Sequence, residues 1–210
     1  MVPSTRTQIL AAADRLFSEK GYHNVSMRAI AAELGISVGN LNYYFPRKAD
    51  LANALLEAQM QQITLPIQPG LDALDQYLRR MLLSLFDHTR LFSDPLVFLS
   101  IPELADGHRA RIGRLRQNLL EMLQAQVDGG FLSAGSSPAF SLEDLTDLLM
   151  YSHLGWQQQL MLFPQPPLEA IESAMHLQWA ALEPWLTPKG QESLARLRQG
   201  APLAASAPAQ

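Results

Sequence analysis

The sequence predicts an all-α protein that begins with a three-helix helix-turn-helix unit and continues as a larger helical domain. Apolar residues recur at three- and four-residue spacing along most of the chain, as they do on the buried face of a helix. Glycine and proline fall where these periodic segments end, and no segment has the strict alternation of a strand. With 210 residues, 48% of them hydrophobic, the chain is long enough to bury a sizeable core.

Residues 26–48 are expected to form two short helices joined by a glycine turn. Ser26 is a suitable N-cap for the first helix, and Gly35 ends it because glycine readily adopts the left-handed conformation found at helix C-termini. Ser37 is a suitable N-cap for the second helix, and Pro46 ends that helix. Two short helices in this arrangement are typical of proteins that place one helix in the major groove of DNA.

The second of these helices is expected to expose side chains that suit contact with DNA. Asparagine can form paired hydrogen bonds with adenine, a small apolar side chain can contact a thymine methyl group, and tyrosine hydroxyls commonly bind phosphate oxygens. Arg47 and Lys48 follow the helix, where cations would meet the phosphate backbone. The predicted DNA-binding residues are Arg28, Ser37, Val38, Gly39, Asn40, Asn42, Tyr43, Tyr44 and Lys48. An ordinary surface helical hairpin would show a similar pattern, so the helix pair alone leaves that alternative open.

From about Thr5 to Leu51 the sequence resembles the N-terminal region of the TetR-type (TetR/AcrR) bacterial transcriptional regulators. The resemblance rests on many spaced positions, which are Ala12, Phe17, Gly21, Tyr22, Ser26, Ile30, Ala31, Gly35, Ser37, Gly39, Leu41, Phe45 and Lys48. The chain departs from the family at Asn42, where the family most often has a tyrosine that contacts the DNA backbone. If Tyr43 takes over that contact, Asn42 is free to contact a base. The preferred operator should then differ from those of relatives that have the common tyrosine.

Charge is unevenly distributed along the chain. The whole chain has 16 basic and 20 acidic residues, and its net charge is -4. Residues 1–48 contain six of the basic and three of the acidic residues, which gives this segment about +3 and the remainder about -7. A basic N-terminal segment suits a phosphate-binding surface, and an acidic remainder weakens non-specific binding to DNA.

The remainder of the chain is also expected to be helical. Proline and glycine mark the joins between expected helices over residues 49–63, 71–90, 94–104, 109–127, 141–163 and 167–183. The sequence and the resemblance together predict three parts, which are a DNA-binding domain over residues 1–48, a ligand-binding and dimerisation domain over residues 49–200, and a disordered tail over residues 201–210.

The last two of these helices carry more apolar surface than a terminal helical hairpin needs. The resemblance implies that they form a four-helix bundle with a second copy of the chain, which would place two helix-turn-helix units on a roughly palindromic site. The predicted interface residues are Leu145, Leu148, Leu149, Ser152, Trp156, Ile171, Met175 and Trp179. Packing in the core of one chain is the open alternative for each of them.

The resemblance also implies a small-molecule pocket between the DNA-binding helices and the dimerisation helices. The predicted lining residues are Phe86, His88, Arg90, Phe98, Met122, Tyr151, His153, Trp156 and Gln157. Aromatic and methionine side chains with a few polar groups suit a mostly apolar molecule, and Arg90 would allow an anionic head group. Core packing is again the open alternative, and His153 is also consistent with an ordinary core histidine.

The sequence gives no support to a catalytic function. The five histidines are isolated, and the chain lacks a metal-ligand pair at helical spacing, a nucleophile elbow, a phosphate loop and a dinucleotide fingerprint. The absence of cysteine excludes disulfides and thiolate chemistry and fits a reducing compartment. No stretch is apolar over the length that a bilayer requires. We expect a cytoplasmic protein that is not an enzyme and has neither a cofactor nor a membrane partner.

Together these observations predict a homodimeric, ligand-responsive transcriptional regulator, most often a repressor that a small molecule releases from a palindromic operator. Its expected partners are double-stranded operator DNA, a second copy of the chain and a small-molecule effector. The alternative is a DNA-organising or adaptor protein with no small-molecule inducer, which would bind many dispersed sites or a protein partner.

Overall fold

The structure is a computed structural model that describes residues 4–63, 65–88, 100–134, 140–163 and 165–200. The regular elements of these residues are helices, and an isolated antiparallel bridge joins Leu132 and Leu186. The elements are α1 (Thr5–Lys20), α2 (Met27–Glu33), α3 (Val38–Tyr44), α4 (Lys48–Ile63), α5 (Leu71–His88), α7 (Pro102–Asp128), α8 (Leu142–Leu162), α9 (Pro167–Leu182), the short 3-10 helix η1 (Glu183–Trp185) and α10 (Pro188–Gly200). The predicted all-α fold is confirmed. Within the described part of the chain, no helix is both long and apolar enough to cross a membrane.

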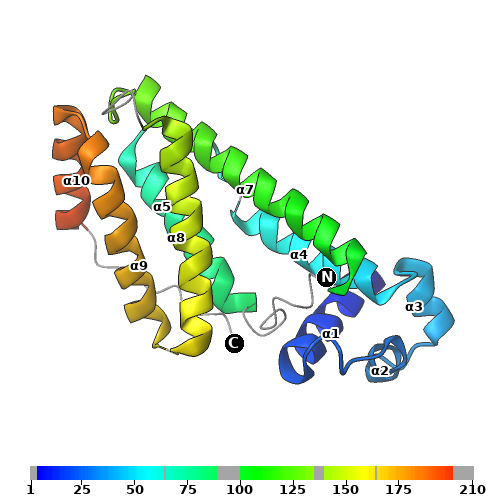
Figure 1. Cartoon of the computed structure of the whole chain (residues 1–210). Coiled ribbons are helices and arrows are strands. Elements are labelled where there is room, and N and C mark those ends of the chain that lie inside the picture. Colours follow the sequence, from blue (N-terminus) through cyan, green and yellow to red (C-terminus); the bar gives the residue numbers. More distant parts are fainter. Residues whose placement is uncertain (1–3, 64, 89–99, 135–139, 164, 201–210) are drawn as a thin grey trace.

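Helices α1, α2 and α3 lie together at one end of the molecule, and α5, α8, α9 and α10 lie at the other end (Figure 1). The N-terminal helices have a small core of their own, in which Ile9, Phe17 and Leu41 have no exposed surface. Leu104, from the first turn of α7, also has no exposed surface and belongs to this core. The long helix α7 is thereby anchored in the N-terminal domain.

Helix α4 belongs to two hydrophobic cores. Leu51 and Leu55 in its first half pack in the N-terminal core, whereas Met60 and Ile63 near its end pack in the larger C-terminal core. Each of these four side chains is at most 8% exposed. Helix α4, together with α7, which also contributes to both cores, therefore fixes how the N-terminal domain sits relative to the rest of the chain.

The C-terminal core is formed by side chains from the end of α4 and from α5, α7, α8, α9, η1 and α10. Buried polar contacts fix α5 within it. The Tyr77 hydroxyl donates to the carbonyl of Leu115 at 3.3 Å. The indole Nε1 of Trp179 donates to the Asp75 carboxylate at 2.9 Å, and Arg79 donates to the same carboxylate at 2.7 Å. These bonds satisfy polar groups that would otherwise be costly to bury.

The sequence predicted one helix ending at residue 104 and another beginning at residue 109, and this break between residues 104 and 109 is wrong. Residues 102–104 form the first turn of α7, which then continues without interruption to Asp128. Pro102 starts this helix because proline lacks the N–H that a first helical position does not need. Residues 94–99 of the predicted shorter helix lie outside the described residues.

Helices η1 and α10 follow the last expected helix, residues 167–183, and were not predicted. Pro184 lies within η1, and Pro188 is the first residue of α10. Thr187 helps to start α10, since its Oγ1 accepts a hydrogen bond from the N–H of Gly190 at 3.1 Å. Buried Leu194 then packs α10 against the C-terminal core. The predicted tail, residues 201–210, lies outside the described residues.

Candidate DNA-binding site

Local capping interactions set the geometry of α2 and α3. The Oγ of Ser26 accepts a hydrogen bond from the N–H of Ala29, and the Oγ of Ser37 accepts one from the N–H of Asn40, both at 3.1 Å. Gly35 in the turn has a φ of 65°, which lies in the left-handed region that favours glycine. These observations confirm the predicted N-caps and the predicted glycine turn.

The inner face of α3 is fixed to the N-terminal domain. Leu41 is fully buried and Phe45, which caps the helix, is 4% exposed. Arg6 of α1 lies over the Phe45 ring, with its guanidinium carbon 5.3 Å from the ring centroid. The sequence analysis did not predict this contact, because nothing local connects Arg6 with Phe45. A helix held in this way keeps a fixed orientation, as insertion into a groove requires.

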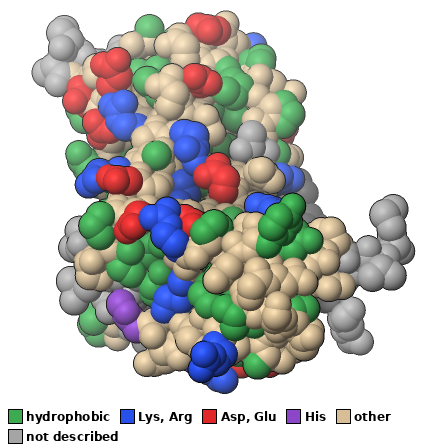
Figure 2. All heavy atoms as spheres, turned by 90° about the vertical axis from the view of Figure 1, so that its right-hand side faces the viewer, with side chains coloured by type: hydrophobic (Ala, Val, Ile, Leu, Met, Phe, Trp, Pro, Cys, Tyr) green, Lys and Arg blue, Asp and Glu red, His purple; other side chains and the backbone are tan. Residues whose placement is uncertain are grey.

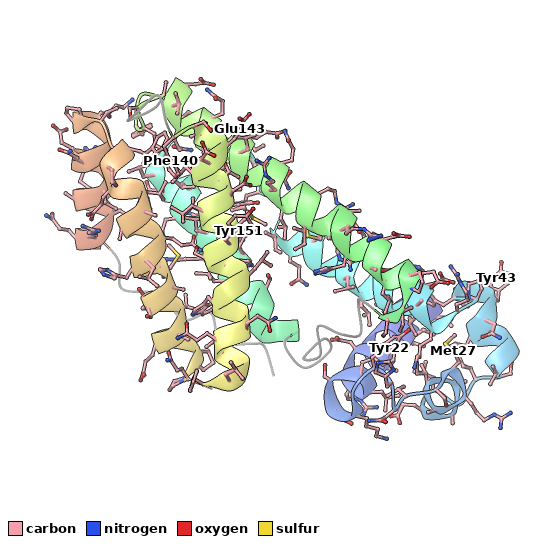
Figure 3. The ribbon with its side chains drawn as sticks, viewed as in Figure 1. Tyr22, Met27, Tyr43, Phe140, Glu143 and Tyr151 are labelled. Atoms are coloured by element: carbon pink, nitrogen blue, oxygen red, sulfur yellow. The ribbon has the colours of Figure 1, made fainter. Side chains whose placement is uncertain are left out.

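The outer face of α3 consists of exposed side chains that can form hydrogen bonds. Asn40 and Asn42 are exposed, and Tyr43 retains 83% of its surface. Tyr43 points away from the molecule at the far end of α3 (Figure 3). Its ring lies edge-on to that of Tyr44, with 5.3 Å between the ring centroids. Asn42 and Tyr43 are therefore both available to a partner outside the chain.

The remaining predicted DNA-binding residues of α2 and α3 differ in how much of their surface is exposed to solvent. Gly39 is exposed. A Cβ atom added to it would lie 3.8 Å from the Oγ of Ser37, which is an ordinary van der Waals contact. Val38 is half-buried against the N-terminal core, so only part of it could reach a base. Arg28 on α2 is exposed and forms no ion pair with any described residue. Arg28 is thus the predicted cation that the structure leaves most available to a phosphate.

Lys48, in contrast, forms contacts within the protein. Its Nζ donates to the backbone carbonyls of Tyr22 and Val25, both at 2.9 Å, and lies 4.1 Å from the centroid of the Tyr22 ring. Burial lowers the pKa of Lys48. These bonds use two of the three ammonium donors. Lys48 mainly joins the start of α4 to the segment between α1 and α2, and only its third donor is left for the predicted phosphate contact.

Arg47 links α3 to α4 and α7. Its Nη2 donates to the Asp50 carboxylate at 2.7 Å, and its Nη1 donates to the Glu103 carboxylate at 2.9 Å. The hydrogen bond with Asp50 raises the pKa of Arg47 and lowers that of Asp50. Exposed ion pairs of this kind contribute little to stability, so a DNA phosphate could compete for Arg47.

The surface charge agrees with the uneven distribution in the sequence. Figure 2 shows the end of the molecule that carries α3, where acidic side chains lie mainly over the upper half and few lie over the lower half, which is formed by the N-terminal domain. Polar and uncharged atoms cover most of that lower half. This surface would not repel the phosphate backbone.

The predicted ligand-binding residues occupy different environments. Met122 and His153 are buried, Trp156 is half-buried against the C-terminal core, and Tyr151 is 70% exposed. Because Tyr151 is so exposed, the prediction that it lines an enclosed pocket within one chain is wrong. Burial lowers the pKa of His153 to about 4, and its Nδ1 has no hydrogen-bond partner in the described part of the chain. Arg90 and Phe98 lie outside the described residues, and the side chains of Phe86, His88 and Gln157 are not among those that the structure describes.

The predicted dimer-interface residues also fall into two groups. Five of them are at most 5% exposed and pack in the core of their own chain. These five are Leu145, Leu149, Ile171, Met175 and Trp179. Helical periodicity identified an apolar face but could not show that the same chain covers it. Leu148 is 44% exposed, Ser152 is exposed and Trp156 is half-buried. The other large apolar side chains exposed on α8 and α9 are Tyr151, Leu162, Leu168 and Leu177.

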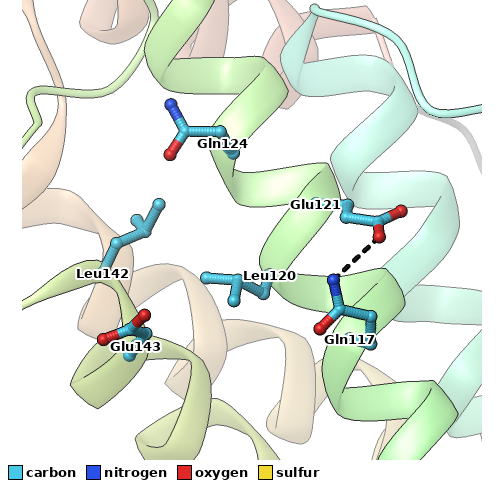
Figure 4. A pocket seen from close by; sticks show the side chains of 6 residues that line it. All are labelled: Gln117, Leu120, Glu121, Gln124, Leu142 and Glu143. Carbon is cyan, nitrogen blue, oxygen red and sulfur yellow. Dashed lines mark hydrogen bonds between the residues drawn. The ribbon is translucent and has the colours of Figure 1, made fainter.

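An open hollow of about 410 Å³ lies between the C-terminal half of α7 and the start of α8 (Figure 4). It is lined by Gln117, Leu120, Glu121, Gln124, Leu142 and Glu143, none of which the sequence analysis predicted. The Nε2 of Gln117 donates to the Glu121 carboxylate at 2.8 Å across its rim. This hollow is remote from α3, and because it is open it would leave much of a small ligand exposed to solvent.

The buried inner face and exposed polar outer face of α3, placed after α2 and a glycine turn, define a helix-turn-helix DNA-binding domain. Residues 9–55 match the family described as bacterial regulatory proteins, tetR family. The regulator UidR of Escherichia coli K12 is 46% identical over 52 residues, which cover 25% of this chain and 26% of UidR. The chain therefore spans about a quarter of the length of this curated relative. Residues 9–55 therefore form a DNA-binding domain of the tetR family type.

Two comparisons extend beyond the N-terminal domain. The regulator HbdR of Aromatoleum sp. strain CIB is 24% identical over 212 residues, covering 96% of this chain and 89% of HbdR. The crystal structure of a TetR-family transcriptional regulator from Marinobacter aquaeolei VT8 matches with a TM-score of 0.74 and 23% identity, covering 94% of this chain and 98% of that chain. The C-terminal helices thus have the fold of TetR-family regulators. All three similar proteins are transcriptional regulators.

The contacts of Lys48 predict the effect of its removal. Lys48→Met should lower the free energy of unfolding by about 1–3 kcal/mol, because two backbone carbonyls lose a charged donor. Arg28→Met, which removes an exposed cation without an ion pair, should change it by less than about 0.5 kcal/mol. Urea unfolding at one chain concentration measures both values. Equal stability of the two variants would show that the Lys48 contacts do not hold the domain together.

Proposed function

We propose that the protein is a homodimeric repressor that binds a palindromic operator through α3 and is released by a small molecule. The observation that carries this proposal is the division of α3 into a buried inner face and an exposed outer face that presents Asn40, Asn42 and Tyr43. In this proposal Asn42 contacts a base edge, whereas Tyr43 and Arg28 bind phosphates. Action on chromosomal DNA would take place in the cytoplasm.

A palindromic operator requires two copies of α3 at a fixed separation, about one turn of DNA apart or a multiple of it. The exposed apolar side chains of α8 and α9 support a dimer interface there, since burying them against a second copy removes them from water. The partner-facing residues in this proposal are Leu148, Ser152 and Trp156 of the predicted set, together with Tyr151.

An effector acts only if it binds one arrangement of the two domains more tightly than the other. The C-terminal domain is the proposed place for it, because α4 connects that domain with α3. An effector that shifts α4 would change the separation or tilt of the two copies of α3 and thereby the affinity for the operator.

The direct test is selection of genomic fragments by the purified full-length protein at near-physiological salt. We expect one or a few palindromic sites. Gly39→Glu should weaken their enrichment at least about tenfold, because it places a negative charge on the face that approaches the phosphates. Gly113→Glu is the matched control, since Gly113 is also an exposed helical glycine, on α7, with no heavy atom within 4 Å of an added Cβ.

The two variants should melt at the same temperature as the unmodified protein. Unchanged enrichment with Gly39→Glu would contradict the placement of α3 in the groove. Many dispersed sites, or no site at all, would instead favour a DNA-organising or adaptor protein.

The dimer proposal predicts the effect of a charge on the exposed face of α8. Tyr151→Glu should convert a dimer into a monomer, because a carboxylate would be buried without a partner at the interface. Leu83→Glu is the control, since Leu83 is 46% exposed on α5 and lies outside the proposed interface. Sedimentation at micromolar concentration gives both masses. A dimer that survives Tyr151→Glu, or a monomeric unmodified protein, would overturn this interface.

A further inference from the structure

Arg111 of α7 is a buried guanidinium without a carboxylate partner in the described part of the chain. It is 5% exposed, and its one hydrogen bond to a described residue is from Nη1 to the Oδ1 of Asn53 on α4, at 3.2 Å. Its Nη2 is buried and has no hydrogen-bond partner among the residues that the structure describes. Burial lowers the pKa of Arg111 to about 10, so the group remains charged at neutral pH. A buried charge without a counter-ion is costly, and proteins rarely retain one without a reason.

The surroundings of Arg111 contain too little negative charge to neutralise it. Glu57 on α4 acts on Arg111 through space, but both of its carboxylate oxygens accept hydrogen bonds from Nη2 of Arg114, at 2.7 and 2.9 Å. One carboxylate thus serves two guanidinium groups. The charge of Arg111 also helps burial to lower the pKa of the neighbouring His108. The group formed by Arg111, Arg114 and Glu57 at the α4–α7 interface therefore carries one positive charge in excess, away from the DNA-binding surface.

We propose that Arg111 binds the anionic group of a small-molecule effector, a carboxylate or a phosphate, at the interface of α4 and α7. An oxyanion would supply the acceptor that Nη2 lacks and would be held in a charge-assisted hydrogen bond. This inference rests on the proposed function, and it names the chemical class of the effector. Arg111 differs from Arg90, which the sequence analysis considered for such a head group and which lies outside the described residues.

The position of Arg111 also connects an anion with α3. Asn53, which accepts from Arg111, donates through its Nδ2 to the backbone carbonyl of Glu103 at 3.1 Å. The side chain of Glu103 in turn accepts from Arg47, which follows α3. Because Nη2 is shielded from solvent, an anion reaches it only when the α4–α7 interface opens locally. Binding of the anion would then shift α4, the helix that begins directly after the DNA-binding unit.

The test compares carboxylic acids with their uncharged primary amides on the full-length protein. Acetate, hexanoate, benzoate and phenylacetate, and sodium phosphate against sodium chloride, are added at fixed pH and ionic strength, and the melting temperature is measured. We expect at least one anion to raise the melting temperature by about 2 °C or more above its uncharged or chloride control, since a ligand that binds the folded state stabilises it.

Arg111→Met should abolish this difference, whereas Arg109→Met should retain it. Arg109 is the matched control because it lies on the same helix, is exposed and pairs with Asp106. Without ligand, Arg111→Met should melt at the same or a higher temperature than the unmodified protein, because an unpaired buried charge is replaced by an apolar side chain. No anion-specific shift in the unmodified protein, or a shift that survives Arg111→Met, would overturn the site.

A second readout needs no variant. An anion bound at Arg111 should raise the pKa of His108, measured from its ring proton shifts, because it neutralises the nearby positive charge. An unchanged His108 pKa in the presence of a stabilising anion would place that anion elsewhere. If no anion effect is found but an operator is selected, the operator proposal is unaffected. If an anion binds but no operator is selected, the anion site has no regulatory role.

Discussion

One continuous helix, α4, sets the relation between the two halves of this protein. Its first half is buried among α1, α2 and α3, and its second half is buried in the C-terminal core. Lys48, its first residue, binds backbone carbonyls between α1 and α2, and Leu104 of α7 closes the N-terminal core from the other side. Because well-packed cores have few alternative arrangements, a displacement of α4 should move α3 as part of one unit.

This construction separates folding from recognition within α3. Buried Leu41 and Phe45 hold the helix, and the turn at Gly35 sets its direction. The outer residues Asn42 and Tyr43 make no contact that the fold requires, so they can change without loss of the domain. The asparagine at position 42 should therefore affect which operator is bound, and it does not disturb the packing of the domain.

The features that were predictable from the sequence are those in which local chemistry decides the structure. Ser26 and Ser37 act as N-caps through bonds to residues three positions away, and Gly35 is required by its own backbone angle. Contacts between distant segments were not predictable. Lys48 was expected to face DNA, and Arg111, among the other basic residues of α7, had the pattern of a surface residue. Spacing shows which face of a helix is apolar, but it does not show whether the same chain or a partner covers that face, as with Leu145 and Trp179.

The central claim is that the outer face of α3 recognises the operator, and base-by-base affinity measures it most directly. The unmodified protein, Asn42→Ala and Tyr43→Phe would be titrated against the selected site and its single-base variants. We predict that Asn42→Ala loses about 1–3 kcal/mol of discrimination at one base pair, whereas Tyr43→Phe weakens binding to every sequence alike. Full affinity and unchanged base preference in both variants would contradict the claim.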